Sequence, residues 1–158
     1  PEGVTPEYDG YSGQKIKQAD VNLIAYPLGA VSDRAQMLRD LKYYEDKVDM
    51  VDGPAMTFSV FAVQYARLGD RRKATEMFRR AYEINLRPPF GVFAETPTSN
   101  NPYFMTGAGG MLQAVLFGFG GLAVTEEGIV QNDPVLPLGW RRLVIKGVGP
   151  EKKTFIVE

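Results

Sequence analysis

The chain has 158 residues, of which 44% are hydrophobic and 23% charged, and its formal net charge is −1. This composition is that of a folded globular protein, and the near-neutral charge gives no electrostatic reason to expect a nucleic acid or an anionic membrane as a partner. Histidine and cysteine are both absent, which removes disulfides, thiolate metal sites and any Ser-His triad, so neither a metal ion nor a cofactor is expected.

The first two thirds of the chain predict helices of two alternating kinds. Segments 16–26, 54–68 and 106–119 are apolar on nearly every side, whereas 33–48 and 71–85 carry apolar residues along one stripe. Helices of the first kind must be surrounded by protein, and those of the second kind have a solvent face. Inner and outer antiparallel helices of an α/α toroid give this alternation, but the chain is too short to close such a ring alone.

The uncharged run from 103 to 124 is long enough to raise the question of a membrane span. It contains six glycines and a central Gln113, which favour a buried helix of a globular protein, so no membrane partner is expected. The glycines at 107, 109 and 110 have no accompanying Lys or Arg and are not a phosphate-binding loop; close helix packing is the better interpretation.

After this run the sequence changes to short apolar segments separated by turn residues. Segments 142–146 and 154–157 predict β-strands, and residues 126–128 predict a hairpin turn. A small β-sheet segment is therefore expected after the helices.

Glu95 is the residue that the sequence singles out for chemistry. It is the last charged residue before Glu126, and the loop that carries it contains no basic residue. A carboxylate without a neighbouring cation, just before an apolar glycine-rich helix, is suited to accepting a proton.

In an up-down arrangement the apolar helices begin at the same end of the assembly. Their starts near Lys17, Pro54 and Thr106 are expected at one rim, together with Glu95. Free N–H groups and partial positive charge at this rim would suit a hydroxyl-rich ligand. Lys17 and Gln18 in the first helical turn are candidates for binding it; a solvated surface pair with the aspartate three positions after Lys17 is the ordinary alternative.

Residues 69–85 support a second interpretation. Gly69, Ala74, Phe78 and Ala81 match the spacing of a tetratricopeptide helix hairpin. Stacked repeats need about three copies, and only one such match is present. A non-catalytic helical interaction module therefore remains as the alternative from another functional class.

Several blocks in order resemble the C-terminal part of the catalytic domain of glycoside hydrolase family 65: IKQADV at 16–21, GPAMT at 53–57, Glu95, and TGAGG at 106–110. That family contains acid trehalases, kojibiose hydrolases, glucosylgalactosyl-hydroxylysine glucosidases and disaccharide phosphorylases. The resemblance spans roughly Ile16 to Leu122, and the segment from Leu136 to Trp140 looks like the start of the family's C-terminal β domain.

The resemblance implies a mainly α fold. Residues 1–122 would form the C-terminal portion of an (α/α)6 catalytic barrel, and 123–158 the start of a C-terminal β-sheet domain. It also implies that Lys17 and Gln18 bind a glucosyl unit and that Glu95 is the general base. The general acid would lie upstream, outside this chain. The chain alone is then expected to be inactive, with the remainder of the polypeptide or a companion chain completing the barrel.

The stretch from 88 to 119 contains no Lys, Arg or His that could offset the repulsion between Glu95 and a phosphate dianion. The expected activity is therefore inverting hydrolysis of a trehalose- or kojibiose-type α-glucoside with release of glucose. A disaccharide phosphorylase of the same family is the alternative.

Overall fold

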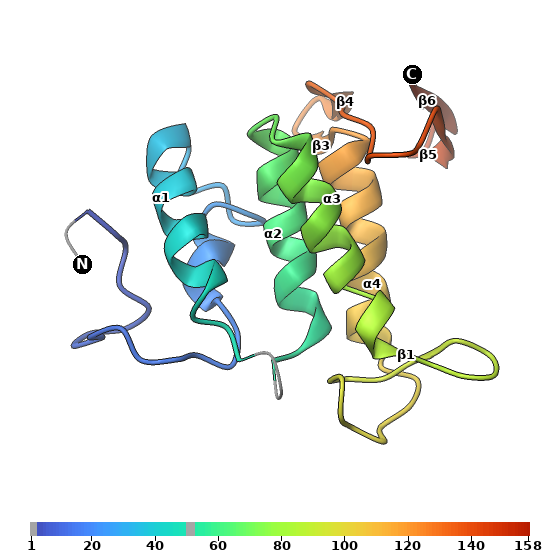
Figure 1. The fold of residues 1–158 in the computed structure, drawn as a ribbon. Coiled ribbons are helices and arrows are strands. Elements are labelled where there is room, and N and C mark those ends of the chain that lie inside the picture. Colours follow the sequence, from blue (N-terminus) through green and yellow to red (C-terminus); the bar gives the residue numbers. More distant parts are fainter. Residues whose placement is uncertain (1–2, 50–52) are drawn as a thin grey trace.

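A computed structural model describes residues 3–49 and 53–158. Its main helices lie side by side, with short β-hairpins at their ends (Figure 1). The helices are η1 (Asp20–Ile24), α1 (Arg34–Glu45), α2 (Ala55–Arg67), α3 (Arg71–Arg80), η2 (Glu83–Asn85), α4 (Met105–Gln113) and η3 (Ala114–Phe119). Of the short ones, η1 and η2 are 3-10 helices, and η3 is a π-helix that directly continues α4.

Helix α2 is the centre of the core. Its sequence is apolar on nearly all sides, and it packs against α3 on one side and against α4 and η3 on another. Phe61, Val63 and Tyr65 of α2 are completely or almost completely buried. This burial anchors α2 firmly, and α2 in turn places its N-terminus at the end of the molecule where the Glu95 loop lies.

The outer helices have the caps that their sequences indicate. The side chain of Asp33 accepts a hydrogen bond from Ala35 N at the start of α1, and that of Asp70 accepts one from Lys73 N at the start of α3. These carboxylates satisfy N–H groups that have no partner within the helix. The predictions of helices at 54–68 and 106–119 are confirmed. The helix predicted over 33–48 is present but ends at Glu45. For 71–85, the regular helix ends at Arg80 and only a short 3-10 turn follows.

The prediction of a helix over 16–26 is wrong. Ile16 is extended and forms a parallel bridge with Val48, in which Ile16 N donates to Lys47 O at 2.9 Å and Asp49 N donates to Ile16 O at 2.8 Å. Within this segment, only Asp20–Ile24 is helical and forms the 3-10 helix η1. This pairing occupies the N–H and carbonyl groups of Ile16, so a helix cannot begin there.

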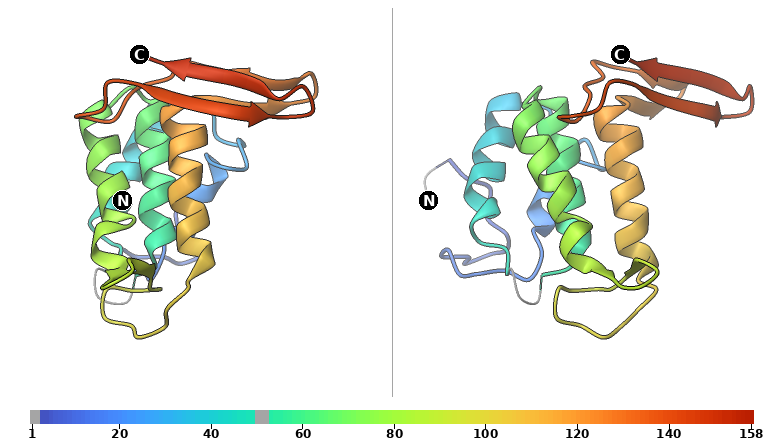
Figure 2. Two further views of the ribbon diagram at one scale, coloured as in Figure 1. Left: turned by 90° about the vertical axis from the view of Figure 1, so that its right-hand side faces the viewer. Right: turned by 45° about the vertical axis from the view of Figure 1, so that its right-hand side comes forward.

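Strands occur as separate antiparallel pairs. They are β1 (Leu86–Arg87) with β2 (Val92–Phe93), β3 (Leu122–Thr125) with β4 (Gly128–Gln131), and β5 (Leu143–Val148) with β6 (Lys153–Val157). The pairs β3–β4 and β5–β6 lie across one end of the helices (Figure 2). The predicted turn at 126–128 is confirmed, because Thr125 pairs with Gly128. The β1–β2 pair was not predicted.

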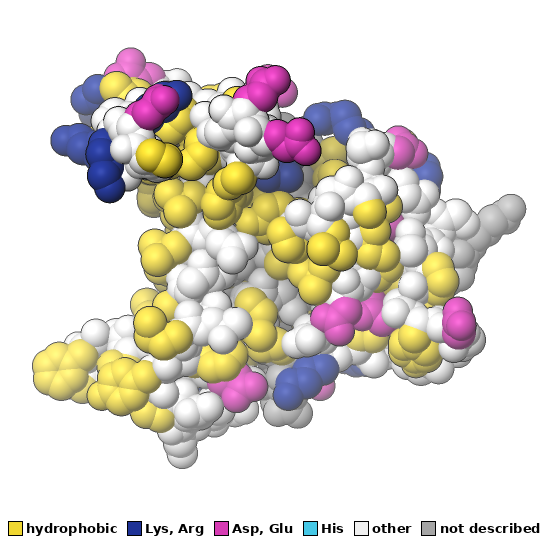
Figure 3. Space-filling view, turned by 180° about the vertical axis from the view of Figure 1, so that it is seen from behind, with side chains coloured by type: hydrophobic (Ala, Val, Ile, Leu, Met, Phe, Trp, Pro, Cys, Tyr) yellow, Lys and Arg dark blue, Asp and Glu magenta, His cyan; other side chains and the backbone are white. Residues whose placement is uncertain are grey.

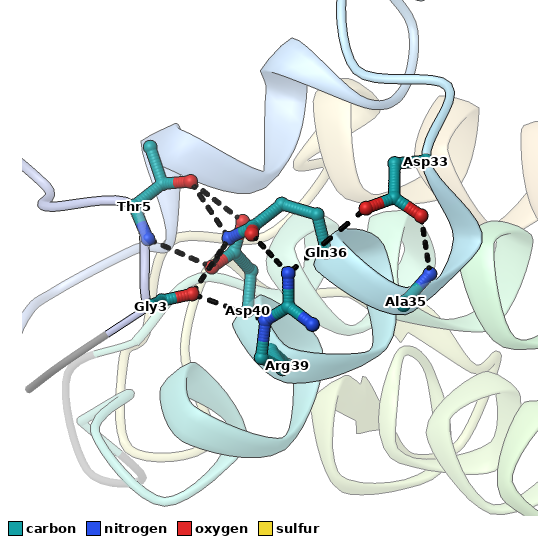
Figure 4. A network of polar contacts seen from close by, with 7 residues as sticks. All are labelled: Gly3, Thr5, Asp33, Ala35, Gln36, Arg39 and Asp40. Atoms are coloured by element: carbon teal, nitrogen blue, oxygen red, sulfur yellow. Dashed lines mark hydrogen bonds and ion pairs between the residues drawn. The ribbon is translucent and has the colours of Figure 1, made fainter.

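The N-terminal segment is tied to α1 by a polar network (Figure 4). Thr5 donates from N and Oγ1 to the two carboxylate oxygens of Asp40, at 2.9 and 2.8 Å. Gln36 donates to Asp40 and to Gly3 O, and Arg39 Nε donates to Gly3 O at 3.1 Å. This network holds residues 3–5 against α1.

The described residues therefore form a helix-rich unit with small sheets, as the sequence predicted. Within residues 3–49 and 53–158, no helix has both the length and the apolarity needed to cross a bilayer.

Candidate active site

Two adjoining hollows lie where α2 begins. Their volumes are about 630 and 560 Å³, and both are lined by Lys15, Ile16, Lys17 and Glu95. Seen from behind, the molecule has a hollowed face crossed by apolar side chains, with acidic and basic side chains together near its lower rim (Figure 3). Charged and apolar groups thus share one concave surface, as is common in sites for small ligands.

Glu95 is half-buried and lies in a bend two residues after the end of β2. Its main-chain oxygen accepts hydrogen bonds from Ala55 N at 3.4 Å and from Asn85 Nδ2 at 3.1 Å. Its carboxylate forms no hydrogen bond or ion pair with any other residue that the structure describes. The main chain of this residue is fixed, while its carboxylate is open to the hollow and can take a proton from a bound water.

Lys17 and Gln18 lie in a bend before η1, and not in the first turn of a long helix as predicted. The surface pair between Lys17 and Asp20, which was the alternative to ligand binding, is not formed. Instead, Gln18 Nε2 donates to Asp20 Oδ1 at 2.9 Å. Lys17 is exposed, and its ammonium group forms no ion pair with another residue that the structure describes.

Glu7 holds the start of η1. Its carboxylate oxygens accept hydrogen bonds from Asp20 N at 2.8 Å and Val21 N at 3.3 Å. Burial raises the pKa of Glu7 above its usual value, and these two N–H groups, which favour the carboxylate, offset only part of that effect. Glu7 therefore fixes the bend that carries the two candidate binding residues.

The structure brings Lys17, Gln18 and Glu95 together, since all of them line the 560 Å³ hollow. Pro54 and Met56, at the start of α2, line it too. Thr106 lines a neighbouring hollow of about 360 Å³ between α2 and α4, which shares Met56 with the 560 Å³ hollow. The start of α4 lies close to the Glu95 loop, because Phe104 N donates to Phe93 O at 2.8 Å.

Sequence reasoning missed several lining residues. Lys15 lines both hollows, Glu7 and Tyr8 line one, and the hydroxyl-bearing Thr98 and Ser99 line the other. The closeness of Lys15 to Lys17 in the sequence was the only available signal. Together these groups suit a ligand rich in hydroxyls. Among the described residues, no three carboxylates gather as they would around a metal ion.

A concave surface lined by hydroxyl, amide, ammonium and carboxylate groups, with the Glu95 carboxylate unpaired among the described residues, suits a ligand rich in hydroxyls. Residues 5–94 match the family described as the glycosyl hydrolase family 65 central catalytic domain, which is more than half of the chain. The chain belongs to this family. The matched range includes Lys17 and Gln18 and ends one residue before Glu95.

The chain is similar to hydrolases from two bacteria. It is 52% identical to a kojibiose hydrolase of Mucilaginibacter mallensis over 100% of the chain and 23% of the relative. It is 53% identical to a kojibiose hydrolase of Flavobacterium johnsoniae over 98% of the chain and 23% of the relative. The chain thus spans about a quarter of the length of these relatives.

A solved structure with a similar fold is described as a putative kojibiose phosphorylase from the human microbiome. The similarity has a TM-score of 0.62 and 20% sequence identity, and it covers 84% of this chain and 18% of the other. At this identity the similarity concerns the fold.

Proposed function

We propose that this chain is part of an inverting α-glucoside hydrolase that releases glucose from a kojibiose- or trehalose-type disaccharide. Residues 1–122 form the C-terminal portion of its (α/α)6 catalytic barrel, and 123–158 begin a C-terminal β-sheet domain. The observation that carries the proposal is the carboxylate of Glu95, unpaired among the described residues, in a hollow that Lys17 and Gln18 also line.

The proposed chemistry assigns one role to each group. Glu95 takes a proton from a water molecule, and the oxygen of that water attacks the anomeric carbon on the face opposite the leaving oxygen. Lys17 and Gln18 donate hydrogen bonds to hydroxyls of the glucosyl unit. The general acid that protonates the leaving oxygen comes from outside this chain, with its carboxyl group about 6.5–9.5 Å from that of Glu95 so that the water fits between them.

The test is Glu95→Gln in the complete polypeptide, assayed for glucose release from kojibiose and from trehalose. The amide cannot accept the proton, so kcat is expected to fall by about 10²–10⁴-fold while KM changes little. Glu126→Gln is the matched control, because Glu126 is exposed in the β3–β4 turn, and it should leave both constants unchanged. An unchanged kcat for Glu95→Gln would remove Glu95 from the mechanism.

A disaccharide phosphorylase is the second candidate, and one observation favours it. Lys15 and Lys17 line the 630 Å³ hollow together with Thr98 and Ser99, so cations and hydroxyls that could bind a phosphate lie near Glu95. The anionic Glu95 in the same hollow opposes phosphate binding and favours water. Glucose release in a buffer without phosphate supports hydrolysis, whereas turnover only with added phosphate supports the phosphorylase.

A further inference from the structure

The Glu95 loop has little regular structure of its own. Residues 94–99 form a bend and a turn between β2 and the segment leading to α4. A catalytic base on such a loop needs outside support, because misplacement by about 1 Å can cost about 10²-fold in rate. The contacts that hold this loop therefore matter for the reaction proposed above.

Asn85 holds the loop on the N-terminal side of the base. Its side chain is 1% exposed, and Nδ2 donates to Ala94 O and to Glu95 O, both at 3.1 Å. Ala94 N donates back to Asn85 O at 2.9 Å. Ala55 N, at the start of α2, also donates to Glu95 O. The peptide group of Glu95 is thus held from both η2 and α2.

At the other end of the Asn85 amide, Oδ1 is buried and forms no hydrogen bond with any residue that the structure describes. Burying a carbonyl group without a hydrogen bond is unfavourable. An apolar side chain of similar size would fill this volume without burying an unsatisfied carbonyl group. It could not, however, donate the two hydrogen bonds that Asn85 gives to the Glu95 loop.

Arg87 holds the loop on the C-terminal side of the base. Its Nη2 donates to Thr96 O at 2.8 Å and to Pro97 O at 2.5 Å. Its Nη1 donates to Ile84 O at 3.1 Å and to Leu86 O at 3.3 Å, so the guanidinium joins the η2–β1 segment to the loop. Arg87 forms no ion pair with a described carboxylate. It is the cation nearest in sequence before Glu95, and its N–H groups are directed at carbonyl oxygens instead of the carboxylate of the base.

We propose that Asn85 and Arg87 are positioning residues that hold the main chain on either side of Glu95 and thereby aim its carboxylate at the attacking water. This inference rests on the proposed function. It goes further, because it predicts that Asn85 and Arg87, which do not line the hollow, have a measurable effect on turnover.

The test uses Asn85→Asp and Arg87→Lys in the complete polypeptide. Aspartate has the same shape as asparagine but replaces the donor by an oxygen, and a lysine ammonium lacks the planar fork that spans Thr96 O and Pro97 O. Each variant is expected to lose about 10- to 100-fold in kcat for kojibiose, with KM changed by less than about threefold. Asn132→Asp and Arg141→Lys, at exposed positions, are matched controls and should keep kcat.

A second readout separates positioning from general structural damage. On the Glu95→Gln background, Arg87→Lys should cost no more than about twofold, because there is no base left to position. If Asn85→Asp fails to fold, Arg87→Lys decides the matter alone, since Arg87 is only half-buried. The positioning proposal is overturned if folded variants keep kcat within about twofold while Glu95→Gln abolishes turnover. If Glu95→Gln itself has no effect, the proposed function is what fails.

Discussion

The buried contact between α1, α2 and α3 leads to a sharp prediction about stability. Glu45, at the end of α1, is 13% exposed and forms an ion pair with Lys73 of α3, which is 25% exposed. Tyr65 of α2 donates its hydroxyl to Glu45 Oε2 at 2.8 Å. Lys73→Met keeps the length of the side chain but removes the charge, so the carboxylate of Glu45 stays buried without its cation.

The expected loss follows from this burial. Removing one partner of a fully buried ion pair costs about 3–5 kcal/mol. The residual exposure of both groups lets solvent screen part of the charge, so the expected decrease in unfolding free energy is about 2–3 kcal/mol. The double variant Lys73→Met/Glu45→Gln should recover most of it, because the neutral amide needs no counter-ion. Lys153→Met removes the partner of Glu151 in an exposed pair 2.8 Å long and should have no measurable effect.

The stabilisation by the Lys73–Glu45 ion pair should also depend on pH. The hydrogen bond from Lys73 to Glu45 raises the pKa of Lys73, while burial acts in the opposite sense. Because this pKa is higher in the folded state, the stabilisation is fully present below the unfolded pKa of about 10.4 and is lost as the pH rises through the folded value. Urea unfolding followed by circular dichroism should therefore show a constant difference between wild type and Lys73→Met up to about pH 9. Equal stability of Lys73→Met and Lys153→Met would refute the reasoning.

Two further predictions concern packing and alkaline pH. Gly118→Ala places a Cβ 3.1 Å from Val63 Cα of α2, whereas Gly109→Ala meets nothing within 4 Å. In chemical unfolding of the 158-residue chain, Gly118→Ala should lower the unfolding free energy by about 1–2 kcal/mol, because the core is overpacked. Gly109→Ala should raise it by up to about 1 kcal/mol through helix propensity. The reverse order of stability would contradict this packing. Burial raises the pKa of Tyr11 to about 12 and also raises that of Tyr44. The unfolded chain ionises first, so stability should fall as the pH rises from about 10 towards 12. The tyrosinate absorbance that is lost in the Tyr11→Phe/Tyr44→Phe variant should appear only at unfolding. If that part of the absorbance appears in the folded state near pH 10, the burial of Tyr11 and Tyr44 is contradicted.

The helices could be predicted because their signals are local. The apolar pattern of α2 and the capping carboxylates of Asp33 and Asp70 lie within or beside the helices that they specify. The segment around Ile16 could not be predicted in this way. Its conformation depends on the pairing with Val48 and on the carboxylate of Glu7, contacts between residues far apart in the sequence. An apolar stretch of that length is equally compatible with a helix until those partners are known.

The candidate site was predictable in part for the same reason. Glu95 stood out because no cation accompanies it in the sequence, and the structure leaves its carboxylate unpaired among the described residues. The lysines that approach the hollow come from the segment before η1, about eighty residues earlier, and only tertiary structure brings Lys15 there. The absence of cations from 88–119 therefore did not imply a hollow without cations. The hydrogen bonds of Asn85 and Arg87 to the loop likewise had no signature in the sequence.

The stereochemistry of the reaction tests the central claim most directly. The complete polypeptide would be mixed with kojibiose in a buffer without phosphate, and the anomeric signals of the released glucose followed by proton nuclear magnetic resonance. If Glu95 activates water for direct displacement, the glucosyl unit is released first as β-glucose, in excess over its equilibrium share, and Glu95→Gln abolishes this signal. Initial release of α-glucose, or no reaction until phosphate is added, would contradict the account.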